Sequence, residues 1–210
     1  MGKDEQAHAY RQKVKSHLKN PGYFIFVMSF IISGCGYLPI NVLLMKDPLT
    51  AEEHNDLGVA YENEGKYELA VREYKMAFNK NNELIVPLVN IGNVFLKQGN
   101  YSEAEKYYQK ALRMNPYDLE AANNLASLYL IVGNEYQKAL MNLTSAVAFN
   151  EGFPAYAMDT MGVLYHRLGN VGKANFFLIK ACENAKDDIG LIREIDKHLK
   201  NLGEIGCEKE

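Results

Sequence analysis

The sequence predicts an all-α protein, an α-solenoid of about four helix–turn–helix repeats followed by a C-terminal capping helix. Three observations predict this fold class. A pattern of small and large apolar residues recurs at a spacing of about 34 residues, which is the signature of a repeat protein. Each copy holds two apolar stretches with the period of an α-helix, about 3.6 residues. A glycine-containing turn separates the two stretches in every copy.

Residues 85–118 carry the clearest copy of the pattern. Its small residues are Gly92, Gly99, Ala104 and Ala111, with large apolar residues between them. Related copies are found on both sides, with turns at Gly65-Lys66, Gly133-Asn134 and Gly169-Asn170. A glycine just after a helix supplies the left-handed residue that ends it, so these turns predict where each first helix stops.

This order of small and aromatic positions resembles the tetratricopeptide repeat, a helix–turn–helix unit of 34 residues. The resemblance covers residues 51–188, divided into 51–84, 85–118, 119–154 and 155–188. It implies a non-enzymatic protein that binds another protein or a peptide segment.

Glycine also recurs inside the first helix of three repeats, at Gly58, Gly92 and Gly162. Glycine costs about 1 kcal/mol relative to alanine in a helix interior. Its recurrence at one phase predicts close approach by the second helix of the same repeat. The aromatic residues at the next turn are expected in the core; they are Tyr61, Phe95, Tyr129 and Tyr165.

The N-terminal 34 residues differ from the rest in charge and hydropathy. They hold five basic and two acidic residues, whereas the whole chain has a net charge of −3. Within these 34 residues, an apolar run at residues 23–32 follows the basic residues and is typical of a signal-peptide core. Ile32-Ser33-Gly34-Cys35 resembles the lipobox of bacterial lipoproteins, which implies removal of 1–34 and lipidation of Cys35, with residues 35–50 as a tether.

The lipoprotein interpretation predicts a lipid-anchored protein of the bacterial cell envelope, facing the periplasm. Because Gly36 stands where an inner-membrane retention aspartate would be, the outer membrane is favoured over the inner one. Two alternatives are an uncleaved anchor over residues 23–45, long enough to span a bilayer, and a buried cytosolic segment. The lipoprotein interpretation and the uncleaved-anchor interpretation both place the repeats outside the cytoplasm.

The two ends of the repeat region have their own signals. Thr50 followed by Glu53 is a capping-box pattern, so a helix is expected to start there and run to residue 63 or 64. A helix at 189–202 is expected to cap the array, with 203–210 as a flexible tail. A disulfide between Cys182 and Cys207 is not expected, because the short tail would have to return along the whole cap helix.

No pattern in the sequence indicates catalysis. His54, His166 and His198 belong to different elements and show no metal-ligand spacing, so no metal or cofactor is expected. There is no glycine-rich phosphate loop, and the net charge gives no nucleic-acid footprint. The expected partner is a protein, with neither a nucleic acid nor a small-molecule substrate.

The tetratricopeptide resemblance implies a concave groove lined by the first helix of each repeat. Asn90 and Asn124 hold the same position in adjacent repeats and are candidates to bind a peptide backbone; the alternative is that they only solvate the surface. The complete candidate set is Asn55, Asp56, Val89, Asn90, Asn93, Leu96, Asn123, Asn124, Ser127, Leu130, Asp159 and Val163.

The predicted function is therefore a membrane-anchored interaction scaffold or assembly factor. Two alternatives are narrower. One is a pilotin-like factor that helps assemble pilus secretins. The other is an adaptor or non-catalytic subunit of an envelope enzyme.

Overall fold

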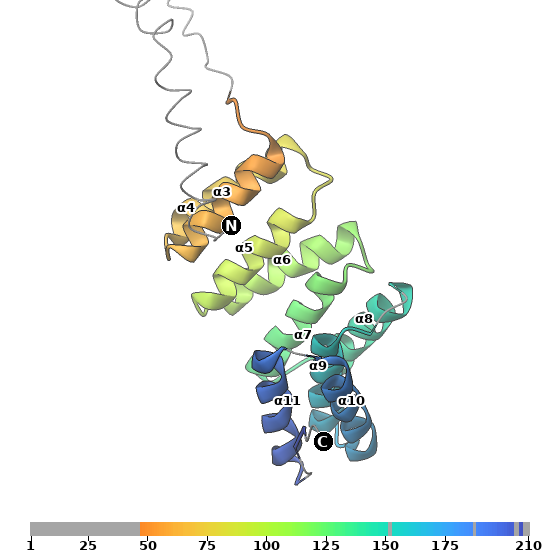
Figure 1. Ribbon diagram of the computed structural model, residues 1–210. Helices are drawn as coiled ribbons and strands as arrows, with labels where there is room; N and C mark the ends of the chain where they lie inside the picture. The colour runs from red at the N-terminus through yellow and green to blue at the C-terminus, as the bar shows by residue number, and fades with distance from the viewer. Residues whose placement is uncertain (1–46, 151–152, 187, 204–205, 208–210) are drawn as a thin grey trace, which may run out of the picture. The chain divides into compact units, whose positions relative to one another are not determined.

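The computed structural model describes residues 47–150, 153–186, 188–203 and 206–207. Within these ranges the secondary structure is entirely helical, which confirms the predicted fold class. The predicted signal peptide, Cys35 and the apolar run lie outside the described residues. The helices are α3 (Ala51–Asn63), α4 (Tyr67–Lys80), α5 (Val86–Lys97), α6 (Tyr101–Met114), α7 (Leu119–Val132), α8 (Tyr136–Phe149), α9 (Ala155–Arg167), α10 (Val171–Asn184) and α11 (Ile189–Asn201) (Figure 1).

The chain divides into two compact units. Unit 1 contains α3 and α4, which pack against each other as one helical hairpin. Unit 2 contains α5 to α11, in which each helix packs against the next in chain order. Figure 1 shows the hairpins of unit 2 stacked one after another, with α11 beside α9 and α10.

Helix ends follow the local sequence signals. The Thr50 side chain accepts a hydrogen bond from the Glu53 N–H, and Glu53 accepts one from the Thr50 N–H, so the predicted capping box is present. Gly99 ends the turn between α5 and α6 with φ +72°, in the left-handed region that favours glycine. The predicted turn glycines at 65, 133 and 169 have the same backbone conformation.

The interior glycines allow the two helices of a repeat to approach closely. A Cβ placed on Gly92 would lie 2.4 Å from the ring of Tyr108, which is fully buried on α6. Gly58 faces Tyr74 in the same way, and Gly162 faces Leu178. The predicted contact between first and second helix is therefore confirmed in three repeats.

The first testable prediction compares two glycine substitutions in unit 2. Gly92→Ala is expected to destabilise, because displacing the Tyr108 ring costs about 1–3 kcal/mol, against a helix-propensity gain of about 1 kcal/mol. Gly172→Ala on α10 meets no atom within 4 Å. It keeps part of the propensity gain, because Gly172 lies in the first turn of α10, and is expected to stabilise by less than about 1 kcal/mol. Urea unfolding followed by circular dichroism measures both; stabilisation by Gly92→Ala would contradict the close approach.

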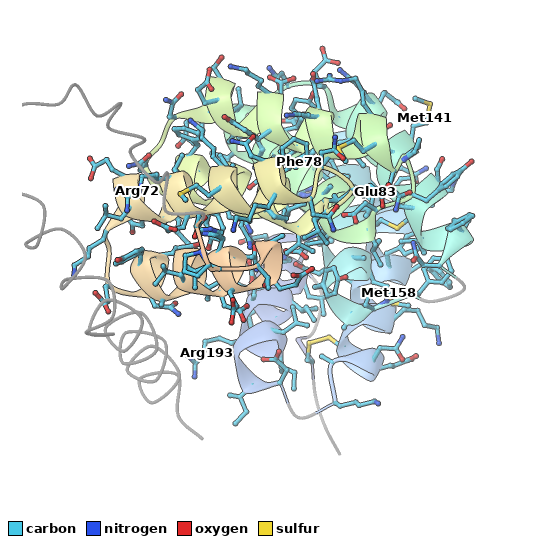
Figure 2. The ribbon with its side chains drawn as sticks, turned by 90° about the horizontal axis from the view of Figure 1, so that it is seen from above. Arg72, Phe78, Glu83, Met141, Met158 and Arg193 are labelled. Atoms are coloured by element: carbon cyan, nitrogen blue, oxygen red, sulfur yellow. A yellow bond between two sulfur atoms is a disulfide. The ribbon has the colours of Figure 1, made fainter. Side chains whose placement is uncertain are left out.

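The capping helix packs on the last repeat through its apolar side. Ile195 and Leu199 of α11 are buried in one cluster with Met158, Leu178 and residues of the α9–α10 hairpin. The opposite side of α11 is polar and exposed, as Arg193 shows in Figure 2. This arrangement is the polar outer surface that a terminal helix of a repeat array needs.

A disulfide joins Cys182 and Cys207, with their Cα atoms 5.6 Å apart, so the expectation that they do not pair is wrong (Figure 2). The Cys207 sulfur lies 3.8 Å from the backbone oxygen of Ile192. The return from the end of α11 to Ile192 is about 14 Å at 1.5 Å per residue. Residues 202–207 can span about 20 Å when extended, so the tail is long enough.

The tail is also held by contacts other than the disulfide. The Cys207 N–H donates a hydrogen bond of 3.0 Å to Asp196 on α11. A Cβ on Gly206 would lie 1.7 Å from the same carboxylate, so only glycine permits this approach. These contacts place residues 206 and 207 against α11, within the segment for which the sequence predicts a flexible tail.

Among the described residues, no helix is both long and apolar enough to cross a membrane.

Candidate functional site

The first helices of the repeats in unit 2 form one continuous surface, because α7 contacts both α5 and α9. A hydrogen-bond network ties α5, α6 and α7 together below it. The Asn124 amide donates to Asn93 Oδ1 at 2.9 Å, and the Tyr108 hydroxyl donates to the same oxygen at 2.8 Å. Asn93 therefore accepts from both neighbouring helices and positions α7 on α5.

The structure places most of the predicted groove residues on these helices and leaves them partly exposed. Asn55 and Asp56 belong to α3 of unit 1, so they are described apart from the others. The half-buried residues of unit 2 are Asn90, Asn93, Leu96, Asn123, Asn124, Ser127, Leu130 and Val163. In this part of the set, the polar side chains come first along α5 and α7, and a leucine follows them towards the C-terminal end of each helix.

Two predicted groove residues lie in the interior. Val89 is only 2% exposed, because its side of α5 packs into the core of unit 2. Asp159 is 6% exposed and is engaged by His198 of the capping helix. The prediction that these two line an open surface is corrected. The repeat alignment identified their phase on the helix, but it did not show which neighbour covers them.

Acidic residues mark the N-terminal end of α7 on this surface. Partial burial raises the pKa of Glu120, and the nearby charge of Asp118 raises it further. Burial also raises the pKa of Tyr156 on α9, with smaller contributions from Glu120 and Asp118. These effects place Tyr156 close to two carboxylates. A positive charge bound here would relieve the repulsion between them.

Asn123 follows one turn after Glu120. Its Oδ1 is buried and accepts no hydrogen bond from any described residue. A buried polar atom without a partner costs about 1–3 kcal/mol. Asn123 therefore holds an unpaired acceptor just beneath the surface of α7, and its half-buried side chain would have to rotate to present that oxygen to a donor from outside the chain.

An ion pair fastens the capping helix to the last repeat. His198 Nδ1 lies 2.7 Å from Asp159 Oδ1, and that hydrogen bond is the main reason why the pKa of His198 is raised. Glu194 lies one turn before His198, and its charge acts in the same direction. Asp159, Glu194 and His198 together offer ligand atoms within 4.8 Å of one another. In the structure, these three side chains interact through the hydrogen bond between His198 Nδ1 and Asp159 and through the charge of Glu194.

A second histidine cluster, in unit 1, was not predicted from sequence. His54 is 1% exposed and lies between two carboxylates, with Nδ1 2.9 Å from Glu73 and Nε2 2.5 Å from Asp47. Lys80 pairs with Asp47 and also donates to the Leu49 carbonyl oxygen, while Arg72 pairs with Glu73. The helical periodicity of the sequence could have indicated this cluster only by placing a polar residue, His54, on the buried side of α3.

The ionic contacts of unit 1 hold the segment that precedes α3. Partial burial acts to raise the pKa of Asp47, but hydrogen bonds from His54, the Leu49 N–H and Lys80 outweigh it. The pKa of Asp47 is consequently below its ordinary value. The last residues of the predicted tether are therefore docked on the α3–α4 hairpin.

The geometry of unit 2 is that of a helical repeat protein. Its hairpins stack in chain order, a capping helix closes the stack, and the first helices of the repeats share one surface. Two family models, both described as tetratricopeptide repeat, match residues 87–118 and 107–141. The chain therefore contains tetratricopeptide repeats.

Several curated proteins share this region. The chain is 29% identical to Protein O-mannosyl-transferase Tmtc3 of Drosophila melanogaster over 48% of this chain and 10% of that protein. It is 31% identical to Photosystem I assembly protein Ycf3 of Cuscuta gronovii over 41% of this chain and 56% of that protein. The matched region thus spans about half of Ycf3 and a tenth of Tmtc3.

Solved structures share the fold. MamA 41-end from Desulfovibrio magneticus RS-1 matches with a TM-score of 0.58 and 20% identity, over 73% of this chain and 86% of that one. A tetratricopeptide repeat protein from Parabacteroides merdae ATCC 43184 matches with a TM-score of 0.62 and 21% identity, over 76% and 61%. Both likenesses support the α-solenoid.

Proposed function

We propose that this protein is a non-catalytic interaction scaffold whose repeats bind a segment of another protein. The observation that carries the proposal is the surface of α5, α7 and α9. It combines the unsatisfied acceptor of Asn123, the acidic end at Asp118 and Glu120, and the aliphatic side chains Leu130 and Val163.

The chemistry of this surface favours an extended segment with a basic residue near one end. A lysine or arginine beside Glu120 would offset the repulsion from Asp118. A backbone N–H of the segment would satisfy Asn123, and an apolar side chain would cover Leu130 at the other end of α7. The surface thus offers charge, hydrogen-bonding and apolar contacts in order along one helix.

The comparisons support the same class of function. Ycf3 is named as an assembly protein, so one relative of the repeat region has an assembly role in its name. We extend that role to this chain as an assembly factor or scaffold that brings its partner into a complex.

We further propose that the scaffold works in the bacterial cell envelope, anchored through lipid on Cys35. The lipobox-like sequence before Cys35 motivates this proposal. The Cys182–Cys207 disulfide supports it, because disulfides persist in oxidising compartments such as the periplasm and are rare in the cytosol.

The binding surface is tested by the double substitution Glu120→Gln/Asn123→Ala. The variant removes an unpaired buried amide oxygen and one of two mutually repelling carboxylates, so it is expected to be at least as stable as the wild type. Removing one charge-assisted and one neutral hydrogen bond, about 2–4 kcal/mol together, should weaken binding at least about thirtyfold. The measurement is titration of a partner, identified by co-purification and mass spectrometry, at low and high salt.

A control of the same chemical kind is Glu183→Gln/Ser145→Ala, on the exposed sides of α10 and α8. It is expected to leave affinity unchanged. If the control weakens binding and the α7 variant does not, the partner binds elsewhere and the proposed surface is wrong.

The anchor is tested by Cys35→Ser in a host that processes lipoproteins. Mass spectrometry of the wild-type protein is expected to show loss of residues 1–34 and the added mass of lipid, whereas the variant should remain an unprocessed precursor. A wild-type protein that keeps residues 1–34 and carries no lipid would exclude the lipoprotein proposal. The surface proposal would be unaffected.

A further inference from the structure

A separate cavity lies at the C-terminal end of unit 2, between α9, α10 and α11, with a volume of about 490 Å³. This size is within the range of about 300–1,000 Å³ that is typical of small-ligand sites. Neither Glu120 nor Asn123 lines it. The cavity shares Val163 with the α5–α7–α9 surface, but its other lining residues have no part in the proposed function.

Nitrogen-bearing side chains dominate its polar lining. His166 and Arg167 come from the last turn of α9, and Lys197 and His198 come from α11. In the part of the chain that the structure describes, no ion pair engages Arg167 or Lys197. The cavity therefore contains two uncompensated cations from two different helices.

The two carboxylates nearby do not cancel these charges. Asp159 is hydrogen-bonded to His198, and the charge of Glu194 acts on the same histidine. Both carboxylates thus act on His198, and neither forms an ion pair with Arg167 or Lys197. Arg167 and Lys197 are left to attract an anion.

The remaining lining is mostly aliphatic. Leu178 is buried beneath the cavity, and Val163 and Leu202 are half-buried at its walls. We propose that this cavity binds a carboxylate carried on an aliphatic stem, with Arg167 and Lys197 holding the carboxylate and these three side chains surrounding the stem. Guanidinium and ammonium groups are the usual partners of carboxylates in proteins.

Such a ligand would also fasten the capping helix. Its carboxylate would bridge Arg167 of α9 to Lys197 of α11, so binding stabilises the docked position of α11 by mass action. The site exists only while α11 is docked. Occupancy should therefore raise the melting temperature of unit 2.

The test uses the full chain and octanoate as the probe, with 1-octanol as the uncharged analogue. Calorimetric titration is expected to show octanoate binding at least about tenfold more tightly than octanol, since charged hydrogen bonds contribute more than neutral ones. Arg167→Gln/Lys197→Gln should remove that preference. Arg113→Gln, an exposed arginine on α6, is the control and should keep it.

The same titration identifies the source of the carboxylate. An acetylated peptide that ends in leucine with a free C-terminus is compared with its C-terminal amide. If the peptide with a free C-terminus binds more tightly than both its amide and octanoate, the carboxylate comes from a polypeptide terminus. If octanoate binds more tightly than the peptide, the carboxylate comes from a small organic acid. Absence of binding by both acids, or equal binding by wild type and the double variant, would overturn the proposal. Neither result bears on the α5–α7–α9 surface.

Discussion

Replacing Cys182 and Cys207 with serine should destabilise the capping end of unit 2 by about 3 kcal/mol. The two cysteines are separated by 25 residues, and a cross-link closing a loop of that size removes about 3–4 kcal/mol of chain entropy from the unfolded state. Among the described helices, α11 packs on α9 and α10 alone, so the loss should be local. Amide hydrogen exchange across α11 measures it.

Reductant provides the control for this experiment. The wild-type protein in dithiothreitol should exchange like the double serine variant, and the variant should not respond to reductant. Equal protection of α11 in oxidised and reduced wild-type protein would show that the disulfide does not hold the cap.

Replacing His54 with alanine is expected to destabilise unit 1 by about 3–5 kcal/mol. The substitution leaves the Glu73 carboxylate, 4% exposed, without its buried partner, and removes the hydrogen bond to Asp47. Breaking a buried ion pair by deleting one member has a cost of this size, because the other charge stays desolvated. Urea unfolding monitored by circular dichroism gives the value.

Arg72→Gln is the matched control, because Arg72, labelled in Figure 2, pairs with the same Glu73. Its own side chain is 62% exposed. An exposed pair contributes about 0–1 kcal/mol, so this change should be small. If Arg72→Gln lowers the free energy of unfolding as much as His54→Ala does, then Arg72 is the main partner of Glu73 and the His54–Glu73 contact contributes less than expected.

The elements of the fold were predictable because their signals are local. Helix starts such as Thr50 and turns such as Gly99 depend on backbone hydrogen bonds within a few residues. The contact of Gly92 with Tyr108 was predictable for a related reason. A repeat places the same two positions opposite each other in every copy, so one unusual glycine phase identifies the facing helix.

The candidate site was predictable only in part. The repeat phase placed Asn123, Asn124 and Ser127 on the surface of α7, as the structure has them. It did not reveal that Asn124 is already bonded to Asn93, or that Asp159 is covered by α11. Phase determines the direction in which a side chain points, whereas burial depends on how far the next helix reaches over it.

The sequence by itself thus determined the all-α repeat fold, the start of the first helix at Thr50 and the glycine turns between helices, because periodicity, caps and glycine turns act over short distances. Only the tertiary structure decided the long-range side-chain pairs. His54 meets Glu73 across 19 residues, Cys182 meets Cys207 across 25, and Asn124 meets Asn93 across 31. These pairs form when packed helices bring side chains within bonding distance, and no local pattern in the chain encodes that separation.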